Sequence, residues 1–215
     1  DYCLVDDIPF FCTCGVGFDA AVSDKFAAAG RRGMLTYAET MLTEGLNYKS
    51  DTYEIEVDGV RQQYKAFLIA CANASQYGNN VYIAPEAHIT YGLMDVTIME
   101  PFKLTEAAAV VYQLMNRTIA QRDGVHTYKC RSLKIRRQAE GVIHYDGDPI
   151  IAPAELDVRI VPGGLRAIVS NYQTHQGGAL MSVLNDIYER IGGDIRENNR
   201  RIVRINRELL NRLKR

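Results

Sequence analysis

Four strand-like segments follow one another closely after Gly124, and this feature most limits what the chain can fold into. They are residues 126–137, 140–145, 155–161 and 165–169. In the third, Leu156, Val158 and Ile160 alternate with charged residues, as in a strand with one face on a core. Short connections between strands favour antiparallel hairpins over a doubly wound sheet, because a parallel crossover needs a dozen or more residues.

Turn signals and apolar periodicity extend this pattern through the rest of the chain. Residues 52–57 alternate apolar and polar side chains and end at Asp58-Gly59, a dipeptide typical of tight hairpins. Residues 64–74 are apolar on both faces, which predicts a central strand. Further strands are predicted at residues 8–16, 81–84 and 96–99, and helices at residues 20–29, 34–46 and 104–120, the last with a cap region at Thr105 and Glu106. We expect a mainly β fold of the α+β class, an antiparallel β-sandwich of about eight or more strands, followed by a basic C-terminal helix.

The segment from Gly141 to Pro149, GVIHYDGDP, ends a strand in two carboxylates, Asp146 and Asp148, on either side of a glycine. One interpretation is a polar hairpin turn, since glycine adopts the positive φ that such a turn requires. The other is a rigid strand end that presents paired acids for proton transfer or for a metal ion. The local pattern leaves both interpretations open.

Two further motifs each have a structural and a chemical interpretation. Gly15-Val-Gly17 follows an apolar strand and either brings the backbone close to a phosphate or forms a tight strand-to-helix turn; a lone G-x-G favours the turn. Cys12 and Cys14 are too close together for an ordinary zinc pair, and no second Cys/His pair with suitable spacing complements them. We therefore predict that the five cysteines are buried free thiols in a reducing compartment.

The C-terminal segment differs from the rest of the chain in charge. Residues 190–215 contain nine Lys/Arg and three Asp/Glu, whereas residues 1–189 carry a net charge of −7. Isoleucine and leucine recur there at close to heptad spacing, as in a helix packed on its own domain, a dimeric coiled coil or a basic helix on anionic lipid. We recognise no signal peptide and no apolar run of the roughly 18 residues that span a bilayer, so we predict a cytoplasmic protein, with peripheral membrane association through residues 190–215 as an option.

Four segments match a set of known motifs in order and roughly in spacing. Residues 10–20 approach the pattern F-x-N-x-x-x-x-G-F-D-A, and residues 84–95, APEAHITYGLMD, approach A-P-x-A-x-x-x-D-G-x-L-D. Gly124 and His126 match a glycine and a histidine that open the next strand, and Asp146-Gly147-Asp148 matches a D-G-E motif. Together these segments resemble the C-terminal half of the diacylglycerol kinase and sphingosine kinase superfamily, in particular its bacterial lipid kinases.

The resemblance implies a domain organisation. Residues 1–175 would form the β-sandwich domain that contributes the lipid pocket in this family, and residues 176–215 a helical extension. The N-terminal domain of the family, whose G-G-D-G-T loop holds the phosphates of ATP, has no match in this sequence. ATP and Mg²⁺ are therefore expected as cofactors of the full-length enzyme, and none is expected on this fragment.

The resemblance also implies roles for single residues. Asp148 stands where the family has the glutamate that takes a proton from the lipid hydroxyl, although its side chain is one methylene shorter, and Asp146 is a second candidate base or a supporting acid. Tyr91 stands where the family has an aspartate that binds a structural magnesium ion, and Cys12 replaces the usual asparagine. Because magnesium prefers hard oxygen ligands with carboxylate charge, we predict no metal site.

Two hypotheses on function follow. The first is the lipid-binding and acceptor-activating domain of an ATP-dependent lipid kinase of the diacylglycerol kinase type, inactive without its nucleotide-binding domain, whose partner is a lipid with a free hydroxyl. The second is a non-catalytic lipid-binding or membrane-associating module, which the departures at Tyr91, Cys12 and Asp148 favour. Whether the chain acts as an enzyme, and whether it forms a homodimer, stays open. Nucleic-acid binding is disfavoured because the body is acidic and lacks a groove-reading motif. The basic residues considered for it are Lys129, Arg131, Lys134, Arg136 and Arg137.

Overall fold

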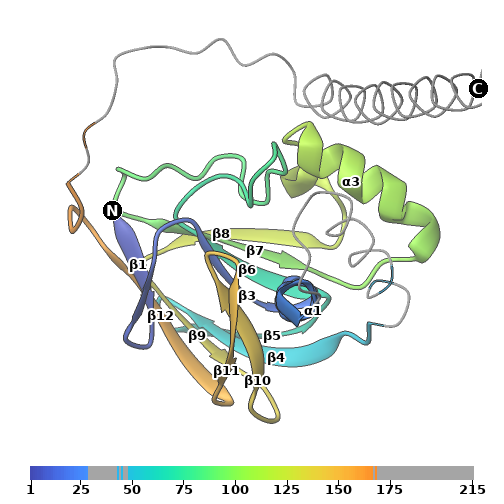
Figure 1. Cartoon of the computed structure of the whole chain (residues 1–215), viewed down its shortest axis with the longest axis horizontal. Helices are drawn as coiled ribbons and strands as arrows, with labels where there is room; N and C mark the ends of the chain where they lie inside the picture. The colour runs from blue at the N-terminus through green and yellow to red at the C-terminus, as the bar shows by residue number, and fades with distance from the viewer. Residues whose placement is uncertain (29–42, 44, 46–47, 167, 169–215) are drawn as a thin grey trace, which may run out of the picture. The chain divides into compact units, whose positions relative to one another are not determined.

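The computed structural model describes residues 1–28, 43, 45, 48–166 and 168 (Figure 1). Internal contacts divide the chain into two units, Asp1–Ser170 and Asn171–Arg215. All described residues belong to the first unit. The predicted C-terminal helix, the predicted boundary at residue 175 and all but residues 43 and 45 of the helix predicted at 34–46 lie outside the described residues.

Within the described residues, two antiparallel sheets of six strands each make up the fold. The first sheet has the strand order β2-β1-β12-β9-β4-β5 and the second has the order β11-β10-β3-β6-β7-β8. The strands of the first sheet are β1 (Tyr2–Val5), β2 (Ile8–Phe10), β4 (Asp51–Val57), β5 (Val60–Ala66), β9 (Ser132–Arg136) and β12 (Glu155–Val161). Those of the second are β3 (Thr13–Gly17), β6 (Leu68–Ala72), β7 (Met94–Met99), β8 (Val125–Cys130), β10 (Gly141–Tyr145) and β11 (Asp148–Ala152). The predicted mainly β, antiparallel fold is confirmed.

The inner faces of the two sheets enclose one apolar core. In β12, Leu156, Val158 and Ile160 are buried, as the alternation predicts. Ile55 of the first sheet and Ile69 of the second belong to the same cluster of buried side chains. Because each fully buried aliphatic side chain contributes about 1.5–3 kcal/mol, this cluster is a main source of stability and holds the two sheets face to face as a sandwich.

The second sheet carries a further apolar layer on its outer face, under α1 (Phe18–Ala28) and α3 (Ala107–Met115). Two short 3₁₀ turns, η1 (Leu104–Glu106) and η2 (Ile119–Gln121), flank α3. Figure 1 shows both helices beside the strands of the second sheet. Every residue of β6 is buried, which confirms that it is a central strand. In the described part of the chain, no helix is long and apolar enough to cross a membrane.

Three predicted strands are each divided in two, and the reason is the same in all of them. Residues 8–16 form β2 and β3, residues 64–74 contribute to β5 and β6 on either side of Phe67, and residues 126–137 form β8 and β9 on either side of Arg131. At each break the chain leaves one sheet and enters the other. A sequence pattern of apolar residues continues through such a corner, so it does not reveal the break.

Other differences concern short edge elements. β1 and β11 were not predicted; β11 is an edge strand that contains Pro149, a residue that weakens a strand signal. Residues 81–84 form a single bridge, Gly78 to Val81, instead of a strand, and the described residues among 165–169 are not in a strand. The helix predicted at 104–120 is shorter, and no side-chain hydrogen bond caps the start of η1 or α3.

Candidate functional site

The hairpin formed by β10 and β11 has Asp146-Gly147 as its two-residue loop. Tyr145 pairs with Asp148 across the loop, and φ is +48° at Asp146 and +93° at Gly147. Positive φ at both central residues is the signature of a type I′ turn, which matches the twist of the two strands. The interpretation of this segment as a hairpin turn is therefore confirmed.

The Asp146 carboxylate is an acceptor for the backbone between β2 and β3. Three successive backbone N–H groups donate to it: Phe11 to Oδ2 at 2.7 Å, Cys12 to Oδ1 at 2.7 Å and Thr13 to Oδ1 at 3.0 Å. The N–H of Asp146 in turn donates to the Thr13 carbonyl at 2.7 Å. Hydrogen bonds to an ionised carboxylate are among the stronger ones in proteins, so Asp146 holds the β2–β3 corner in place.

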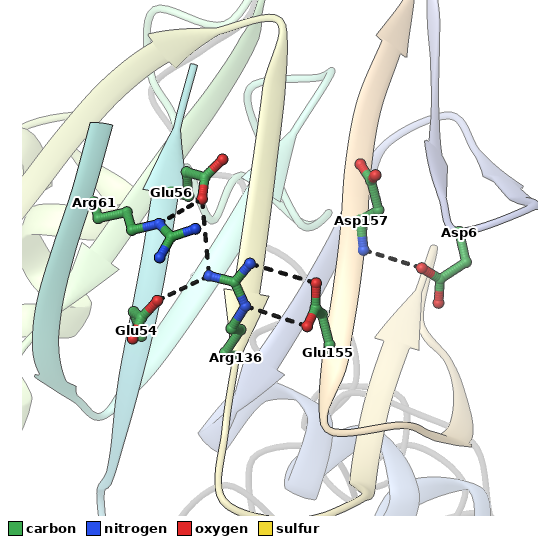
Figure 2. A network of polar contacts seen from close by, with 7 residues as sticks. All are labelled: Asp6, Glu54, Glu56, Arg61, Arg136, Glu155 and Asp157. Atoms are coloured by element: carbon green, nitrogen blue, oxygen red, sulfur yellow. Dashed lines mark hydrogen bonds and ion pairs between the residues drawn. The ribbon is translucent and has the colours of Figure 1, made fainter. Parts of the chain in front are cut away.

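Two other hairpin aspartates bind a neighbouring backbone in the same way. Asp58, with φ of +44°, donates its N–H to the Ser132 carbonyl at 3.1 Å, and its carboxylate accepts the Ser132 N–H at 2.9 Å. Asp6, with φ of +50°, donates to the Asp157 carbonyl at 2.7 Å and accepts the Asp157 N–H at 3.0 Å (Figure 2). The fold thus uses one structural device at three hairpins, and Asp146 is the third case.

Asp148 has a different environment from Asp146, although only Gly147 separates them. It is the first residue of β11 and is exposed. Among the described residues no hydrogen bond or ion pair engages its carboxylate. In the antiparallel register Asp148 lies opposite Tyr145, while His144 lies opposite Pro149, so Asp148 and His144 are on opposite faces of the hairpin. The structure therefore brings both predicted acids to one turn, one saturated with backbone donors and one open to solvent.

A buried polar cluster lies on the helix side of the second sheet. Asp19, in the first turn of α1, accepts hydrogen bonds at Oδ2 from the Tyr77 hydroxyl at 2.9 Å and from Nε2 of His144 at 3.1 Å, and at Oδ1 from the Ala20 N–H at 2.8 Å. Asp19 is 9% exposed and His144 2%. Because a carboxylate only accepts, we assign the His144 proton to Nε2. Nδ1 of His144 is buried and has no hydrogen-bond partner among the described residues.

Two glycines of β3 make this cluster possible. A Cβ atom on Gly15 would overlap Oδ2 of Asp19 and lie 2.9 Å from Nε2 of His144, so only glycine allows their contact. Gly17 has φ of +101°, and a Cβ there would lie 2.6 Å from the Phe67 carbonyl oxygen. The strand ends at Gly17 and α1 begins at the next residue, which confirms the strand-to-helix turn.

The loop before β7 contains the position where the family resemblance implied a metal ligand. Within the described part of the chain, the buried hydroxyl of Tyr91 has no hydrogen-bond partner. Nζ of Lys129 lies 5.2 Å from the centre of the Tyr91 ring, 3.2 Å from the Glu86 carboxylate and 4.0 Å from Oδ1 of Asp95. A neutral phenol stands at the position of the implied ligand, and the ammonium group of Lys129 already pairs with the two nearby carboxylates, so these residues do not fit a magnesium site.

Asp95 is a buried carboxyl of β7, just after this loop, and lies directly opposite Lys129 in the pairing of β7 and β8. Burial raises the pKa of Asp95 to about 6, and the positive charge of Lys129 opposes that rise. Among the described residues, Oδ2 of Asp95 has no hydrogen-bond partner. The described residues contain no group of three or more His, Cys, Asp or Glu side chains that could hold a metal ion.

Cys12 corrects one prediction about the cysteines. All five are free, but Cys12 is exposed, in the corner that Asp146 holds, because this corner lies at the edge of the sandwich. Burial of its sulfur and the charge of Asp146 raise the pKa of the Cys12 thiol. The buried cysteines are Cys3, Cys14, Cys71 and Cys130.

Besides Lys129, Arg136 and Arg137 of the basic residues considered for nucleic-acid binding have partners within the fold. Arg136 binds Glu54 at 2.8 Å and Glu155 at 3.2 Å on the outer face of the first sheet (Figure 2). Arg137 is partly buried, which lowers the pKa of its guanidinium. It donates to the carbonyls of Gly141, Val142, Ala152 and Pro153, at the open end of the β10–β11 hairpin.

Sequence reasoning missed the cluster of Asp19, His144 and Tyr77 as a site. Asp19 stood inside the G-F-D-A motif, so the signal for that residue was present. His144 is 125 positions away in the chain and Tyr77 is 58 positions away. Nothing in the local pattern around either residue indicates a partner at such a distance.

Comparison with known proteins identifies a family to which the chain is similar. Residues 12–169 match the model of the family described as "YegS C-terminal NAD kinase beta sandwich-like domain". A protein named diacylglycerol kinase from Mycobacterium tuberculosis is 23% identical over 158 residues, which are 71% of this chain and 49% of that protein. An uncharacterized protein from Synechocystis sp. is 25% identical over 174 residues, 77% of this chain and 40% of that protein.

Solved structures share the fold. A crystal structure described as "a putative diacylglycerol kinase from Bacillus anthracis str. Sterne" has a TM-score of 0.52 at 15% identity and covers 75% of this chain and 53% of its own. A second structure of such a protein from the same organism has a TM-score of 0.52 at 17% identity, with coverages of 75% and 54%. The chain spans about half the length of the curated relatives that it matches.

Proposed function

Because the chain belongs to the family of YegS C-terminal NAD kinase beta sandwich-like domains, we propose that it is the part of a diacylglycerol kinase-like enzyme that binds and activates a lipid acceptor. The similarity to a longer protein named diacylglycerol kinase supports the proposal. The nucleotide-binding part, with ATP and Mg²⁺ as cofactors, would lie in the remainder of a longer protein. Since phosphoryl transfer depends on positioning of the phosphates, the 215 residues alone should not phosphorylate lipid.

The observation that carries the proposal is the contrast between the two acids of the hairpin. A general base needs lone pairs that a substrate proton can reach, and it needs a rigid support. Asp148 is exposed at the start of β11, directly after a two-residue turn. Asp146 uses both carboxylate oxygens to bind three backbone N–H groups. We therefore assign the base to Asp148 and a positioning role to Asp146.

In the proposed step, Asp148 is the one group of this chain that exchanges a proton. Asp148 takes the proton of the acceptor hydroxyl while the hydroxyl oxygen forms a bond to the γ-phosphorus of ATP. The bond from that phosphorus to the oxygen bridging to the β-phosphate breaks, and ADP leaves with the electron pair. The proton on Asp148 then passes to water. In this proposal the chain supplies the base and holds the acceptor oxygen in position.

The similarity to a protein named diacylglycerol kinase supports a lipid as the acceptor. The apolar layer between the second sheet and the helices is filled by side chains such as Phe18, Leu68 and Leu114. Asp148 lies on the opposite face of its hairpin from His144, which borders that layer. We therefore expect the acceptor hydroxyl to reach Asp148 from outside this layer.

The test is turnover by the longer protein that contains this chain, with diacylglycerol as acceptor. We expect Asp148→Asn to lower kcat at least about a hundredfold with a small change in KM, as loss of a general base does. Asp146→Asn keeps one carbonyl acceptor for the β2–β3 corner, so we expect a smaller loss. Asp7→Asn is the matched control, because Asp7 is also an exposed hairpin aspartate next to an aspartate that binds backbone.

Two outcomes would contradict the assignment. Turnover unchanged by Asp148→Asn would remove this residue from the mechanism. Equal losses in the Asp7 and Asp148 variants would mean that a general effect of charge, and not a base, is responsible. Phosphorylation of lipid by residues 1–215 alone would contradict the division of labour between the two parts.

A second candidate, a non-catalytic lipid-binding module, is favoured by one specific observation. Lys129 lies next to Tyr91, Glu86 and Asp95, at the position where the family resemblance implies a metal ion in other members. A protein that no longer needs the full catalytic apparatus could lose such a site. Lipid binding by the longer protein together with absent turnover on several lipid alcohols would favour this module over the kinase.

A further inference from the structure

Helix α3 has no charged residue along its length. Its sequence, AAAVVYQLM, is apolar on all sides except for one glutamine. A helix of this composition is normally buried all round or lies against lipid. In this fold α3 is at the outside, next to the second sheet (Figure 1).

Within the part of the chain that the structure describes, one side of α3 is covered and the other is exposed. Val110 and Leu114, which are 4% and 8% exposed, pack into the apolar layer on the second sheet. On the other side Leu104, Val111 and Tyr112 are 56%, 46% and 59% exposed. Leu104 lies in η1 at the start of the helix, and the spacing of these residues, i, i+7 and i+8, places them along one face.

The charges around this face are arranged at its ends. Lys103 precedes η1 and is exposed, and Arg117 follows α3, with its guanidinium 4.1 Å from the centre of the Tyr82 ring. Glu106 is the single acidic residue between Lys103 and Arg117, and it forms an ion pair with Arg122. The face therefore combines exposed apolar side chains with basic groups at both ends.

We propose that the α3 face, defined as Leu104, Ala108, Val111 and Tyr112, docks on an anionic lipid bilayer. The apolar side chains would enter the boundary between headgroups and acyl chains, and the basic groups at the two ends would meet the negative headgroups. Tyrosine is a residue that favours this boundary, because its ring is apolar and its hydroxyl is polar.

The inference rests on the proposed function, since a lipid acceptor is dissolved in a bilayer and the protein must reach it there. A second copy of the chain or another part of a longer protein would also cover an apolar face. The bilayer matches it better in charge, because both ends of the face are basic and its one acid is neutralised by an arginine.

The experiment uses the full chain, which contains no tryptophan, so that one introduced tryptophan reports its own surroundings. Tyr112→Trp places it on the α3 face, and Val60→Trp places it at an exposed apolar position in the β4–β5 hairpin, where Val60 is 61% exposed. Vesicles of phosphatidylglycerol are compared with vesicles of phosphatidylcholine. For the Tyr112→Trp variant we expect a blue shift of the tryptophan fluorescence, and quenching by brominated acyl chains, with the anionic vesicles only. We expect neither effect for the Val60→Trp variant.

A second pair of variants measures affinity. Val111→Asp puts a charge into the α3 face, and we expect binding to anionic vesicles to weaken at least about tenfold. Ile151→Asp changes an apolar residue that is 66% exposed in β11 and should leave binding within about twofold of the wild type. Circular dichroism of each variant confirms that it is folded.

Three outcomes would overturn the proposal. Vesicle binding without a change in the fluorescence of the Tyr112→Trp variant would place the membrane contact elsewhere, for example in residues 190–215. An affinity of the Val111→Asp variant for anionic vesicles equal to that of the wild type would also place the membrane contact elsewhere. A blue shift on raising the protein concentration without vesicles would identify a second copy as the occupant. None of these measurements uses turnover, so loss of lipid phosphorylation with intact docking would count against the proposed function alone.

Discussion

The two sheets share a core but differ in what lies on their outer faces. On the first sheet the outer face carries ion pairs in water, among them Arg136 with Glu54 and Glu155 (Figure 2). On the second sheet the outer face is apolar, and α1 and α3 cover it. Asp19, a buried charged side chain of this layer, is bound to His144 and Tyr77. Strands that alternate in burial, such as β12, thus give the first sheet a solvated surface, whereas β6 and β7, which are buried throughout, form the wall of a second core.

This difference decides where polar groups have large effects. Exposed ion pairs contribute about 0–1 kcal/mol each, because water screens them and competes for the same groups. A buried carboxylate with defined donors is strongly coupled to its surroundings, and removal of one partner leaves the others unsatisfied. We therefore propose that the chemistry of the domain takes place at the second sheet, which includes the hairpin of Asp146 and Asp148, and that the first sheet is a scaffold. The following predictions test that division.

The largest effect is expected for Gly17→Ala in the second sheet. The new Cβ would lie 2.6 Å from the Phe67 carbonyl oxygen at a φ of +101°, so steric overlap adds to backbone strain. We expect the free energy of unfolding to fall by about 3 kcal/mol or more in urea denaturation. Gly59→Ala in the first sheet has a similar φ of +90° and nothing within 4 Å of its Cβ, so it should lose only about 1–2 kcal/mol. Equal losses would show that overlap with the second sheet is unimportant.

Removal of the buried Asp19 carboxylate is expected to lower the free energy of unfolding by about 3 kcal/mol. Asp19→Ala would remove the acceptor that the Tyr77 hydroxyl and Nε2 of His144 share, in a site that is nearly inaccessible to water. Asp19→Asn keeps one acceptor oxygen and should lose less. The measurement is chemical denaturation of the folded chain. A loss below about 1 kcal/mol for the alanine variant would mean that this cluster is no more important than a surface pair.

The Asp95→Asn variant should differ from the wild type in free energy of unfolding by about 3 kcal/mol at most, and the difference should depend on pH. Its pKa is raised from 3.8 to about 6 in the folded protein, so the folded state takes up the proton at a higher pH than the unfolded chain. The contribution of this group therefore favours folding more as the pH falls from about 7 to about 4. Asp95→Asn should be more stable than the wild type near pH 7, with the difference vanishing near pH 4. A difference that does not vary with pH would contradict the raised pKa.

The smallest effect is expected on the outer face of the first sheet. Glu155→Ala removes one partner of Arg136, but Glu54 remains at 2.8 Å. We expect a loss below about 1 kcal/mol, decreasing further in high salt. Urea denaturation at low and at high ionic strength measures it. A salt-independent loss of several kcal/mol would mean that the first sheet also depends on specific polar contacts.

Features with a local cause could be predicted from the sequence. Asp58-Gly59 and Asp146-Gly147 both form hairpins, because glycine after aspartate suits two positive φ angles whatever surrounds the turn. The alternation in β12 and the fully apolar β6 also follow from local pattern. Asp146 and Asp148 could be recognised as candidate site residues in the same way, while their different environments could not.

What the tertiary structure decided depends on which distant segments share the same space. The N–H groups that saturate the Asp146 carboxylate come from residues more than 130 positions away, which separates it from the open Asp148. The hydrogen bond between Asp19 and His144 also depends on the fold, because the two residues are far apart in the chain. So does the corner at Phe67, where one apolar run passes from the first sheet to the second. By itself the sequence determined the turns, the strand faces and the family, since these follow from local conformational preference and ordered motifs. The pairing of polar groups was decided only by the fold, because hydrogen bonds join whatever the packed sheets bring together.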